Sequence, residues 1–298
     1  MVILFEKRYS SEDSSLRENC LREKDLDTKL EASLMLASFC NVLKMPDISE
    51  ADELLCFLAE QQVSAEDAIW IVTDNSQIEI ANQAGVATVG YFVDGSSSFL
   101  HTNYVVQNLE EIDEKYLDRV RMRYHGIPWT IGETKRCSIR EFSMEDLDSL
   151  FELYEKPNMT DFMEPLYDYE QEKEYQKAYI RHMYGYYEYG MWLIFDRTTK
   201  ELIGRAGLEH RQYGDESELE LGYMIAPEYQ GRGYATEVCR FVINYAWQNS
   251  EFDKINCLID EKNIASIGLT QKLGFEYAGK IDTDGHVFNR YILYKRKK

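Results

Sequence analysis

The stretch PEYQGRGYATEVCRFVINYA, residues 227–246, decides the fold of the second half of this chain. It places Gly231 and Gly233 directly before a segment whose apolar residues recur at helical spacing: Ala235, Val238, Val242 and Tyr245. A helix N-terminus carries unpaired backbone N–H groups and a partial positive charge, and glycine lets that backbone approach an anion closely. The sequence therefore predicts a strand, a turn and a helix that together hold phosphate oxygens.

The spacing of the glycines excludes two nucleotide-binding patterns at this turn. A dinucleotide fingerprint needs G-x-G-x-x-G, whereas Gly233 is followed by Tyr-Ala-Thr. A Walker loop needs Gly-Lys-Ser/Thr, which the turn lacks. The phosphate must belong to another kind of ligand.

The turn matches the Q/R-x-x-G-x-G/A signature and resembles the GCN5-related N-acetyltransferases (GNAT), over about residues 137–296. The resemblance implies the fold of that family, a mixed and mostly antiparallel, splayed sheet with four helices. It implies that the backbone of Met224, Ile225 and Ala226 pairs with the pantetheine arm of acetyl-CoA. It also implies that the turn binds the pyrophosphate through Gln230, Gly231, Arg232, Gly233, Tyr234 and Ala235.

A second match lies in KNIASIGLTQKLGF, residues 262–275, which is similar to the Asn-containing helix of the same family. Asn263 and Ser266 then fall where the family meets the pantetheine and the thiol end of the cofactor. Many members carry a tyrosine at the position of Thr270, and that phenol is the usual candidate for protonating the departing thiolate. Members resembling ribosomal-protein and aminoglycoside N-acetyltransferases often have serine at the position of Ser266, which is the candidate donor here.

Acyl transfer to an amine also needs a base for the amine proton. In ESELELGYMIAP, residues 216–227, strand alternation places Glu218 and Glu220 on one face. The resemblance favours Glu220 as the general base, and a backbone N–H near Ile225 as the oxyanion donor. In the alternative interpretation, both glutamates only keep an exposed face of the strand in contact with water. His210 is a second candidate for the base.

The reaction predicted for the second domain is acetyl transfer from acetyl-CoA to a primary amine of a small molecule or a peptide. A tyrosine-rich segment, residues 167–189, could form a wall of the acceptor cleft or serve packing alone, with Asp161, Glu164 and Asp168 attracting a cationic amine. A protein N-terminus, a polyamine, an aminoglycoside and an amino-acid-like metabolite all stay open as acceptors. A non-catalytic acyl-CoA-binding sensor is the alternative function, and a phosphohydrolase carried by the first domain is a third.

Two domains are expected, because HGIPWTIGETKRC, residues 125–137, punctuates the chain with Gly126, Pro128 and Gly132. We place a domain of α/β class at 1–134 and one of α+β class at 135–298. In the first, helical spacing over 26–43 and 49–62 is followed by a pattern of alternating strands and one helix at 68–107. That order predicts a truncated Rossmann-like parallel sheet.

The segment AIWIVTDNSQIEIANQAGVATVGYF, within residues 68–92, resembles the C-terminal half of a haloacid-dehalogenase-like (HAD-like) hydrolase. The resemblance gives Asp74 the position of the magnesium-binding acid. The nucleophilic Asp of D-x-D is missing, because Glu6 follows the first strand and the next acid of that kind is Asp13. We expect a domain without phosphohydrolase activity that packs, oligomerises or senses a ligand.

The composition limits the partners. A net charge of −20 argues against nucleic acid, because phosphate backbones are bound by clustered lysine and arginine. The six cysteines form no C-x-x-C pair, and the five histidines lack metal-ligand spacing, so we expect no metal site. No signal peptide or long apolar run is found, which predicts a cytoplasmic protein without membrane attachment.

Overall fold

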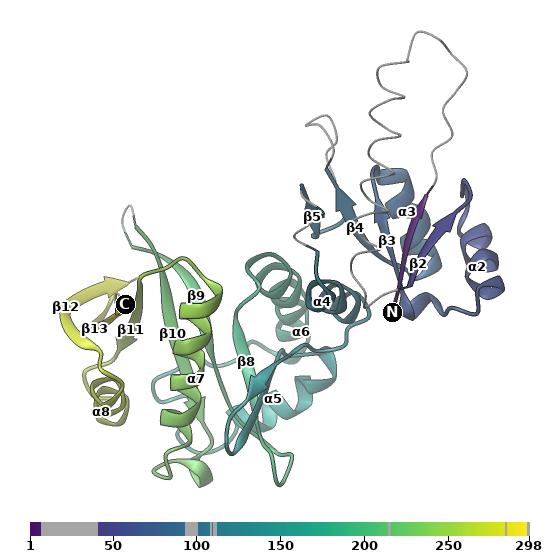
Figure 1. Cartoon of the computed structure of the whole chain (residues 1–298). Coiled ribbons are helices and arrows are strands. Elements are labelled where there is room, and N and C mark those ends of the chain that lie inside the picture. The colour runs from purple at the N-terminus through teal and green to yellow at the C-terminus, as the bar shows by residue number, and fades with distance from the viewer. Residues whose placement is uncertain are drawn as a thin grey trace. The chain divides into compact units, whose positions relative to one another are not determined.

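The computed structural model describes residues 1–6, 41–92, 101–107, 109, 112–213, 216–283 and 285–296. The chain divides into two compact units, Met1–Ile127 and Pro128–Lys298 (Figure 1). The second unit starts before residue 135 because strand β6 (Thr130–Glu133) pairs with β7 (Cys137–Arg140) at the edge of the second sheet.

The first unit contains a five-stranded sheet in the order β2-β1-β3-β4-β5, and every pair of neighbours is parallel. Its strands are β1 (Val2–Glu6), β2 (Asn41–Met45), β3 (Ala68–Val72), β4 (Ala87–Tyr91) and β5 (Val105–Val106). Its helices are α2 (Ala51–Glu60), α3 (Asn75–Ala84) and α4 (Glu114–Tyr124). One apolar cluster joins the sheet to α2 and α3, and another joins it to α4. The predicted parallel sheet is confirmed.

Helix α3 follows local signals in the sequence. The Asp74 carboxylate accepts hydrogen bonds from the backbone N–H groups of Ser76 and Gln77, which caps the helix N-terminus. Gly85 ends the helix in the left-handed region at φ 70°. The structure thus gives Asp74 a capping role, while its magnesium role and the likeness to dehalogenase-type hydrolases stay predictions. Asp13 lies outside the described residues.

The helix expected over 26–43 is wrong at its C-terminal end. Residues Asn41–Met45 form strand β2, which runs parallel to β1 with Leu43 opposite Leu4. Pairing with a neighbouring strand outweighs local helical spacing, since strand stability depends on cross-strand contacts. Residues 26–40 lie outside the described part of the chain, and the helix expected over 49–62 is confirmed as α2.

The second unit contains an eight-stranded sheet in the order β12-β13-β11-β10-β9-β8-β7-β6. Beyond β6 and β7, its strands are β8 (Met191–Asp196), β9 (Leu202–Tyr213), β10 (Glu216–Ile225), β11 (Lys254–Ile259), β12 (Glu276–Thr283) and β13 (His286–Tyr294). Neighbouring strands are antiparallel except for the β10–β11 pair.

The α-helices in the described part of this unit are α5 (Leu147–Tyr154), α6 (Tyr169–Tyr179), α7 (Tyr234–Asn249) and α8 (Ile264–Leu273). Helix α6 continues as a π-helical segment, η5 (Ile180–Tyr187). A mixed, mostly antiparallel sheet with four helices is therefore confirmed.

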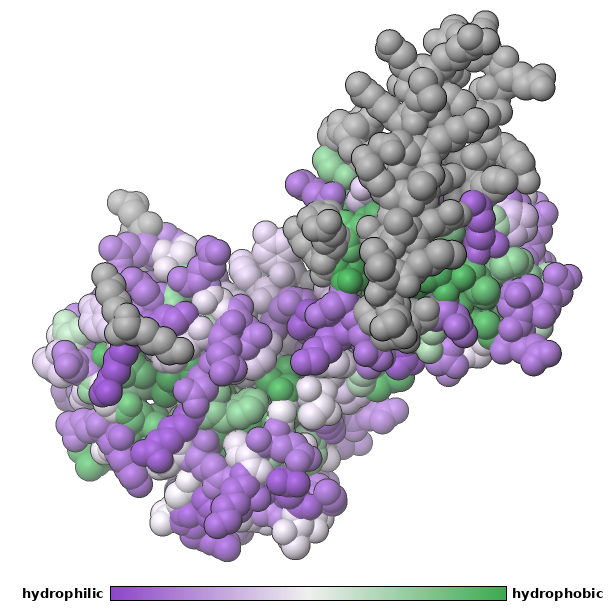
Figure 2. Space-filling view, in the orientation of Figure 1, coloured by the Kyte–Doolittle hydropathy of each residue, from purple (hydrophilic) through white to green (hydrophobic). Residues whose placement is uncertain are grey.

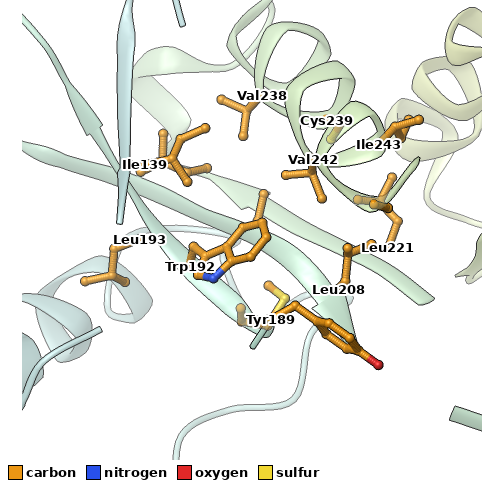
Figure 3. Packing of buried hydrophobic residues seen from close by; sticks show 14 of the residues in the cluster. Ile139, Tyr189, Trp192, Leu193, Leu208, Leu221, Val238, Cys239, Val242 and Ile243 are labelled. Atoms are coloured by element: carbon orange, nitrogen blue, oxygen red, sulfur yellow. The ribbon is translucent and has the colours of Figure 1, made fainter. Parts of the chain in front are cut away.

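The core of the second unit lies between the sheet and α7. Trp192 of β8 and Leu221 of β10 are packed near Val238 and Val242 of α7 (Figure 3), and all four are almost fully buried. The Trp192 ring also meets the ring of Tyr245 edge to face, with 4.9 Å between the centroids. The predicted apolar stripe of α7 therefore fixes this helix against β8 and β10.

Strands β10 and β11 are paired over a short length only. The register contains two residue pairs, Leu219 with Ile255 and Glu220 with Asn256. Toward its C-terminal end, β10 stays paired with β9 as far as Ile225, but it no longer pairs with β11. The sheet is therefore open between these two strands beyond Glu220.

The exterior of the described residues is largely hydrophilic on the side shown in Figure 2. None of the helices in the described ranges combines the length and the apolar character that a membrane crossing requires.

We predict that Gly207→Ala destabilises the second unit by at least about 2 kcal/mol. A Cβ atom at Gly207 would lie 1.8 Å from the backbone oxygen of Gly190, so strands β8 and β9 would have to move apart. The matched control is Gly268→Ala in α8, where a Cβ meets nothing within 4 Å and alanine favours the helix. Urea unfolding of both variants measures the difference, and equal stability would contradict the packing described.

Candidate active site

The glycine turn lies between the end of β10 and the start of α7. A short 3-10 turn, Pro227–Tyr229, leaves the strand, and Gly231 and Gly233 follow with φ of 68° and 83°. Residues that carry a side chain rarely adopt this left-handed backbone conformation, so glycine is favoured at both positions. Gly233 is the N-cap of α7 and contributes no side-chain cap, which leaves the first N–H groups of the helix available to an anion.

Side chains around the turn hold it in place. The Gln230 Nε2 group donates to the backbone oxygen of Ile225 at 2.8 Å, so this side chain ties the turn to the strand end. Arg136 donates to the backbone oxygen of Arg232 at 2.9 Å and to Glu237 Oε2 at 2.7 Å.

The Arg136 guanidinium also lies 3.9 Å from the centroid of the Tyr234 ring, and the Tyr234 hydroxyl donates to Asp196. Sequence reasoning missed Arg136 and Glu237. Arg136 lies about 100 residues before the turn, so no local pattern pointed to it.

The open edge of β10 leads from the turn toward the middle of the sheet. Two of the groups expected to pair with pantetheine already have partners within the protein. The Ala226 N–H donates to Ile203 O at 2.8 Å, and the Ile225 oxygen accepts from Gln230. A ligand along this edge therefore meets mainly the backbone that precedes these two groups.

Glu220 lies where β10 and β11 part. Its carboxylate accepts a hydrogen bond of 2.5 Å from the Tyr213 hydroxyl and lies 3.7 Å from Arg211 Nε. Burial raises the pKa of Glu220, and the Tyr213 hydrogen bond opposes this shift. The positive charge of Arg211 also lowers the pKa, and the negative charge of Glu209, the register partner on β9, raises it. A half-buried carboxylate with raised proton affinity is suited to accepting a proton.

Glu218 is fully buried and belongs to an ionic cluster. Its carboxylate contacts Arg290 Nη2 at 2.6 Å and Lys254 Nζ at 2.5 Å, and it also accepts a hydrogen bond from the Asn256 amide. The cluster links β10, β11 and β13 next to the point where the sheet opens. The interpretation that Glu218 and Glu220 only solvate an exposed face is therefore wrong.

Helix α8 follows β11 in the chain, and its first turn is in contact with Tyr223 of β10. Asn263 caps it by accepting from the Ser266 N–H at 3.1 Å. The Ser266 carbonyl accepts from the Thr270 hydroxyl at 3.2 Å and from the Tyr223 hydroxyl at 3.5 Å. Thr270 is buried and bonded within the helix, so its hydroxyl is not directed toward a ligand. The approach of Tyr223 to Ser266 was not foreseen from the sequence.

His210 lies in an aromatic cluster. Its Nδ1 is 3.3 Å from the Tyr189 hydroxyl, and its ring stacks on that of Tyr187. In register His210 is opposite Leu219, whereas its neighbour Glu209 is opposite Glu220. Adjacent strand residues point to opposite faces, so His210 is poorly placed to act beside Glu220.

Some tyrosines of the tyrosine-rich segment are packed in the core, and others are exposed. The hydroxyls of Tyr179 and Tyr184 bond to the backbone N–H and oxygen of Met191, and both rings are buried. Tyr175 is exposed and lines a hollow of about 400 Å³ together with Glu209. Of the three acids expected near the acceptor, Asp168 caps α6, and Asp161 and Glu164 are exposed.

Within the described ranges, no cluster of three histidine, cysteine, aspartate or glutamate side chains could bind a metal ion. Four cysteines fall in these ranges and all are free: Cys56, Cys137, Cys239 and Cys257. Cys20 and Cys40 lie outside them.

Comparison with known proteins gives a consistent picture for the second unit. Residues 136–276 match the family described as acetyltransferase (GNAT) domain. The uncharacterized protein YkkB of Bacillus subtilis is 34% identical over 166 residues, which cover 55% of this chain and 94% of that protein. The uncharacterized N-acetyltransferase YoaA of the same organism is 29% identical over 151 residues, covering 50% and 84%.

A third relative is the spermidine N(1)-acetyltransferase of Escherichia coli, which is 24% identical over 155 residues, covering 51% of this chain and 80% of that protein. The fold, the glycine turn and these relatives together define an N-acetyltransferase. Through its second unit the chain belongs to the GNAT family, whose acetyl donor is acetyl-CoA.

Proposed function

We propose that the second unit transfers the acetyl group of acetyl-CoA directly to a primary amine within the opening between β10 and β11. The observation that carries this proposal is the position of Glu220. It belongs to the last residue pair that joins β10 to β11, and the glycine turn lies at the other end of the same free strand edge. A thioester ligand held by the turn would extend along this edge toward the carboxylate.

In this proposal the backbone of Gln230–Ala235 binds the pyrophosphate, and the side chain of Gln230 keeps the turn in place. Met224, Ile225 and Ala226 provide the strand edge for the pantetheine arm. Asn263 and Ser266 lie at the start of α8, which follows β11 in the chain. The left-handed conformation of Gly231 and Gly233 supports the anion site, because it brings successive N–H groups to one concave surface.

Glu220 is proposed as the general base. The amine nitrogen attacks the thioester carbonyl, its proton passes to the Glu220 carboxylate, and the carbon–sulfur bond breaks. The thiolate then takes up a proton, for which we propose the Ser266 hydroxyl as donor, while water returns a proton to Ser266. The hydrogen bonds of the Thr270 hydroxyl to the backbone of α8 support this choice over Thr270.

The acceptor is proposed to be a small-molecule or peptide amine. One relative is named for spermidine, so polyamines belong in any panel of acceptors.

Substitution of the turn glycine tests the anion site. We expect Gly233→Ala to weaken coenzyme A binding about tenfold or more, because alanine disfavours φ of 83° and moves the N–H groups. Gly285→Ala is the matched control, since Gly285 has the same φ of 83° in the β12–β13 turn. Calorimetric titration with coenzyme A measures both, and an equal loss of affinity in the two variants would contradict the assignment.

The pH dependence of kcat/KM tests the base. The carboxylate must be ionised to accept a proton, so activity should rise as pH passes through the raised pKa of Glu220. Glu220→Gln should lower kcat by at least about 100-fold and remove this rise. Tyr213→Phe removes a hydrogen bond that favours the ionised form, so the rise should move to higher pH with activity kept above it. An unchanged profile in Glu220→Gln would show that another group is the base.

A further inference from the structure

Arg205 of β9 is a buried cation that has no ionic partner among the described residues. Only 7% of its surface is exposed, and its Nη1 group donates to the Tyr154 hydroxyl at 3.1 Å. Among the residues that the structure describes, no carboxylate lies within 4 Å of its guanidinium, and its Nε has no hydrogen-bond partner. Buried charges in proteins are normally paired, because removing them from water is costly. The guanidinium therefore has unused capacity to bind an anion.

Arg205 lies on the same face of the sheet as the proposed base. Residues 205, 207 and 209 alternate along β9, and their register partners on β10 are Met224, Gly222 and Glu220. Arg205 and Glu209 are four positions apart on the strand, which corresponds to about 13 Å between Cα atoms. The row of the sheet between them consists of Met191, Gly207 and Gly222, and the Met191 sulfur packs over Gly222. Arg205 is thus separated from Glu209 and Glu220 by one row of uncharged residues.

Tyrosines of α6 lie within reach of both charges. After burial, the largest influences on the pKa of Tyr175 are Glu209, which raises it, and Arg205, which lowers it. The same two charges act on Tyr179. Tyr175, Tyr179 and Met183 line the hollow of about 400 Å³ whose other wall includes Glu209. Arg211 also lines the hollow, where it pairs with Glu209 at 2.6 Å. The hollow therefore offers aromatic and apolar surface beside Glu209 and its cationic partner.

We propose that the amine acceptor is a small amino-carboxylate, such as a free amino acid with an apolar or aromatic side chain. Its amine lies at Glu220 and Glu209, its carboxylate binds Arg205, and its side chain enters the hollow beside Tyr175. This proposal rests on the proposed acetyltransferase function and narrows its substrate class.

Pairing of a substrate carboxylate with the Arg205 guanidinium is chemically favourable. A guanidinium binds a carboxylate through two parallel hydrogen bonds, and burial strengthens that interaction once both charges are present. A polyamine is disfavoured at this position, because its second ammonium would approach Arg205. A peptide N-terminus is also disfavoured, since its α-carboxyl carbon is bonded in an amide and carries no charge.

The experiment compares each amino acid with its own decarboxylated amine. Phenylalanine with phenethylamine, tyrosine with tyramine, and leucine with isoamylamine are supplied with acetyl-CoA, and release of the coenzyme A thiol is followed. We expect kcat/KM to favour the amino acid in at least one pair by about tenfold or more. We expect Arg205→Met to remove that preference by raising KM for the amino acid. The kcat/KM for the decarboxylated amine should stay within about twofold of wild type.

Two further variants separate charge from structure. Arg205→Lys keeps the charge and should keep part of the preference, whereas Tyr154→Phe removes the hydrogen bond to Arg205 and should leave the preference intact. Thermal melting checks that each variant folds. If Arg205→Met does not fold, calorimetric binding of phenylalanine and phenethylamine to the wild-type complex with coenzyme A decides the question directly.

The outcomes are distinguishable. Acetylation of decarboxylated amines or polyamines in preference to amino acids would overturn the carboxylate assignment and leave the transferase function standing. If Arg205→Met lowers kcat/KM equally for an amino acid and for its decarboxylated amine, Arg205 has only a structural role. Failure of every amine to release thiol, with coenzyme A bound, would contradict the proposed function together with the substrate class.

Discussion

The structure of the second unit depends on the separation of β10 from β11 after two residue pairs. Backbone N–H and C=O groups inside a sheet normally have hydrogen-bond partners. A strand edge left open in the middle of a sheet can therefore form hydrogen bonds with a ligand. The crossover through α7 explains why the opening and the proposed anion site occur together. The chain leaves β10 at its C-terminal end, and the glycine turn and the start of α7 follow within nine residues of Ile225. One local interruption of the sheet therefore creates both the open strand edge and the proposed anion site at its end.

The charges near the opening have different tasks. Glu218 is surrounded by Arg290, Lys254 and Asn256, and this cluster holds three strands in register beside the opening. Glu220, two residues later on the same face, has a neutral hydrogen-bond donor in Tyr213 and only a more distant cation in Arg211. These different surroundings support a structural role for Glu218 and the proposed role of Glu220 as the base. Arg205 completes the set on this face, because it is buried without a carboxylate partner among the described residues.

The sequence predicted those parts of the site that depend on local conformation. Gly231 and Gly233 need left-handed backbone, Asn263 caps its helix, and strand alternation puts Glu218 and Glu220 on one face, so each leaves a short-range signal. The sequence did not show how the rest of the chain covers that face. The burial of Glu218, the attachment of Arg136 to the turn and the isolation of Arg205 depend on residues from several elements far apart in the chain. In the first unit, the strand at Asn41–Met45 was mistaken for helix for the same reason, because β1 and not the local pattern determines its conformation.

Hydrogen–deuterium exchange with and without coenzyme A tests the central claim most directly, because it reports on the backbone of the turn and of the open strand edge in one experiment. The account predicts that the ligand slows exchange in peptides covering 221–226 and 230–236, while strand β9, already paired on both sides, changes little. Binding of coenzyme A without protection of these two segments, or with protection confined to other parts of the chain, would show that the opening between β10 and β11 is not where the acetyl donor lies.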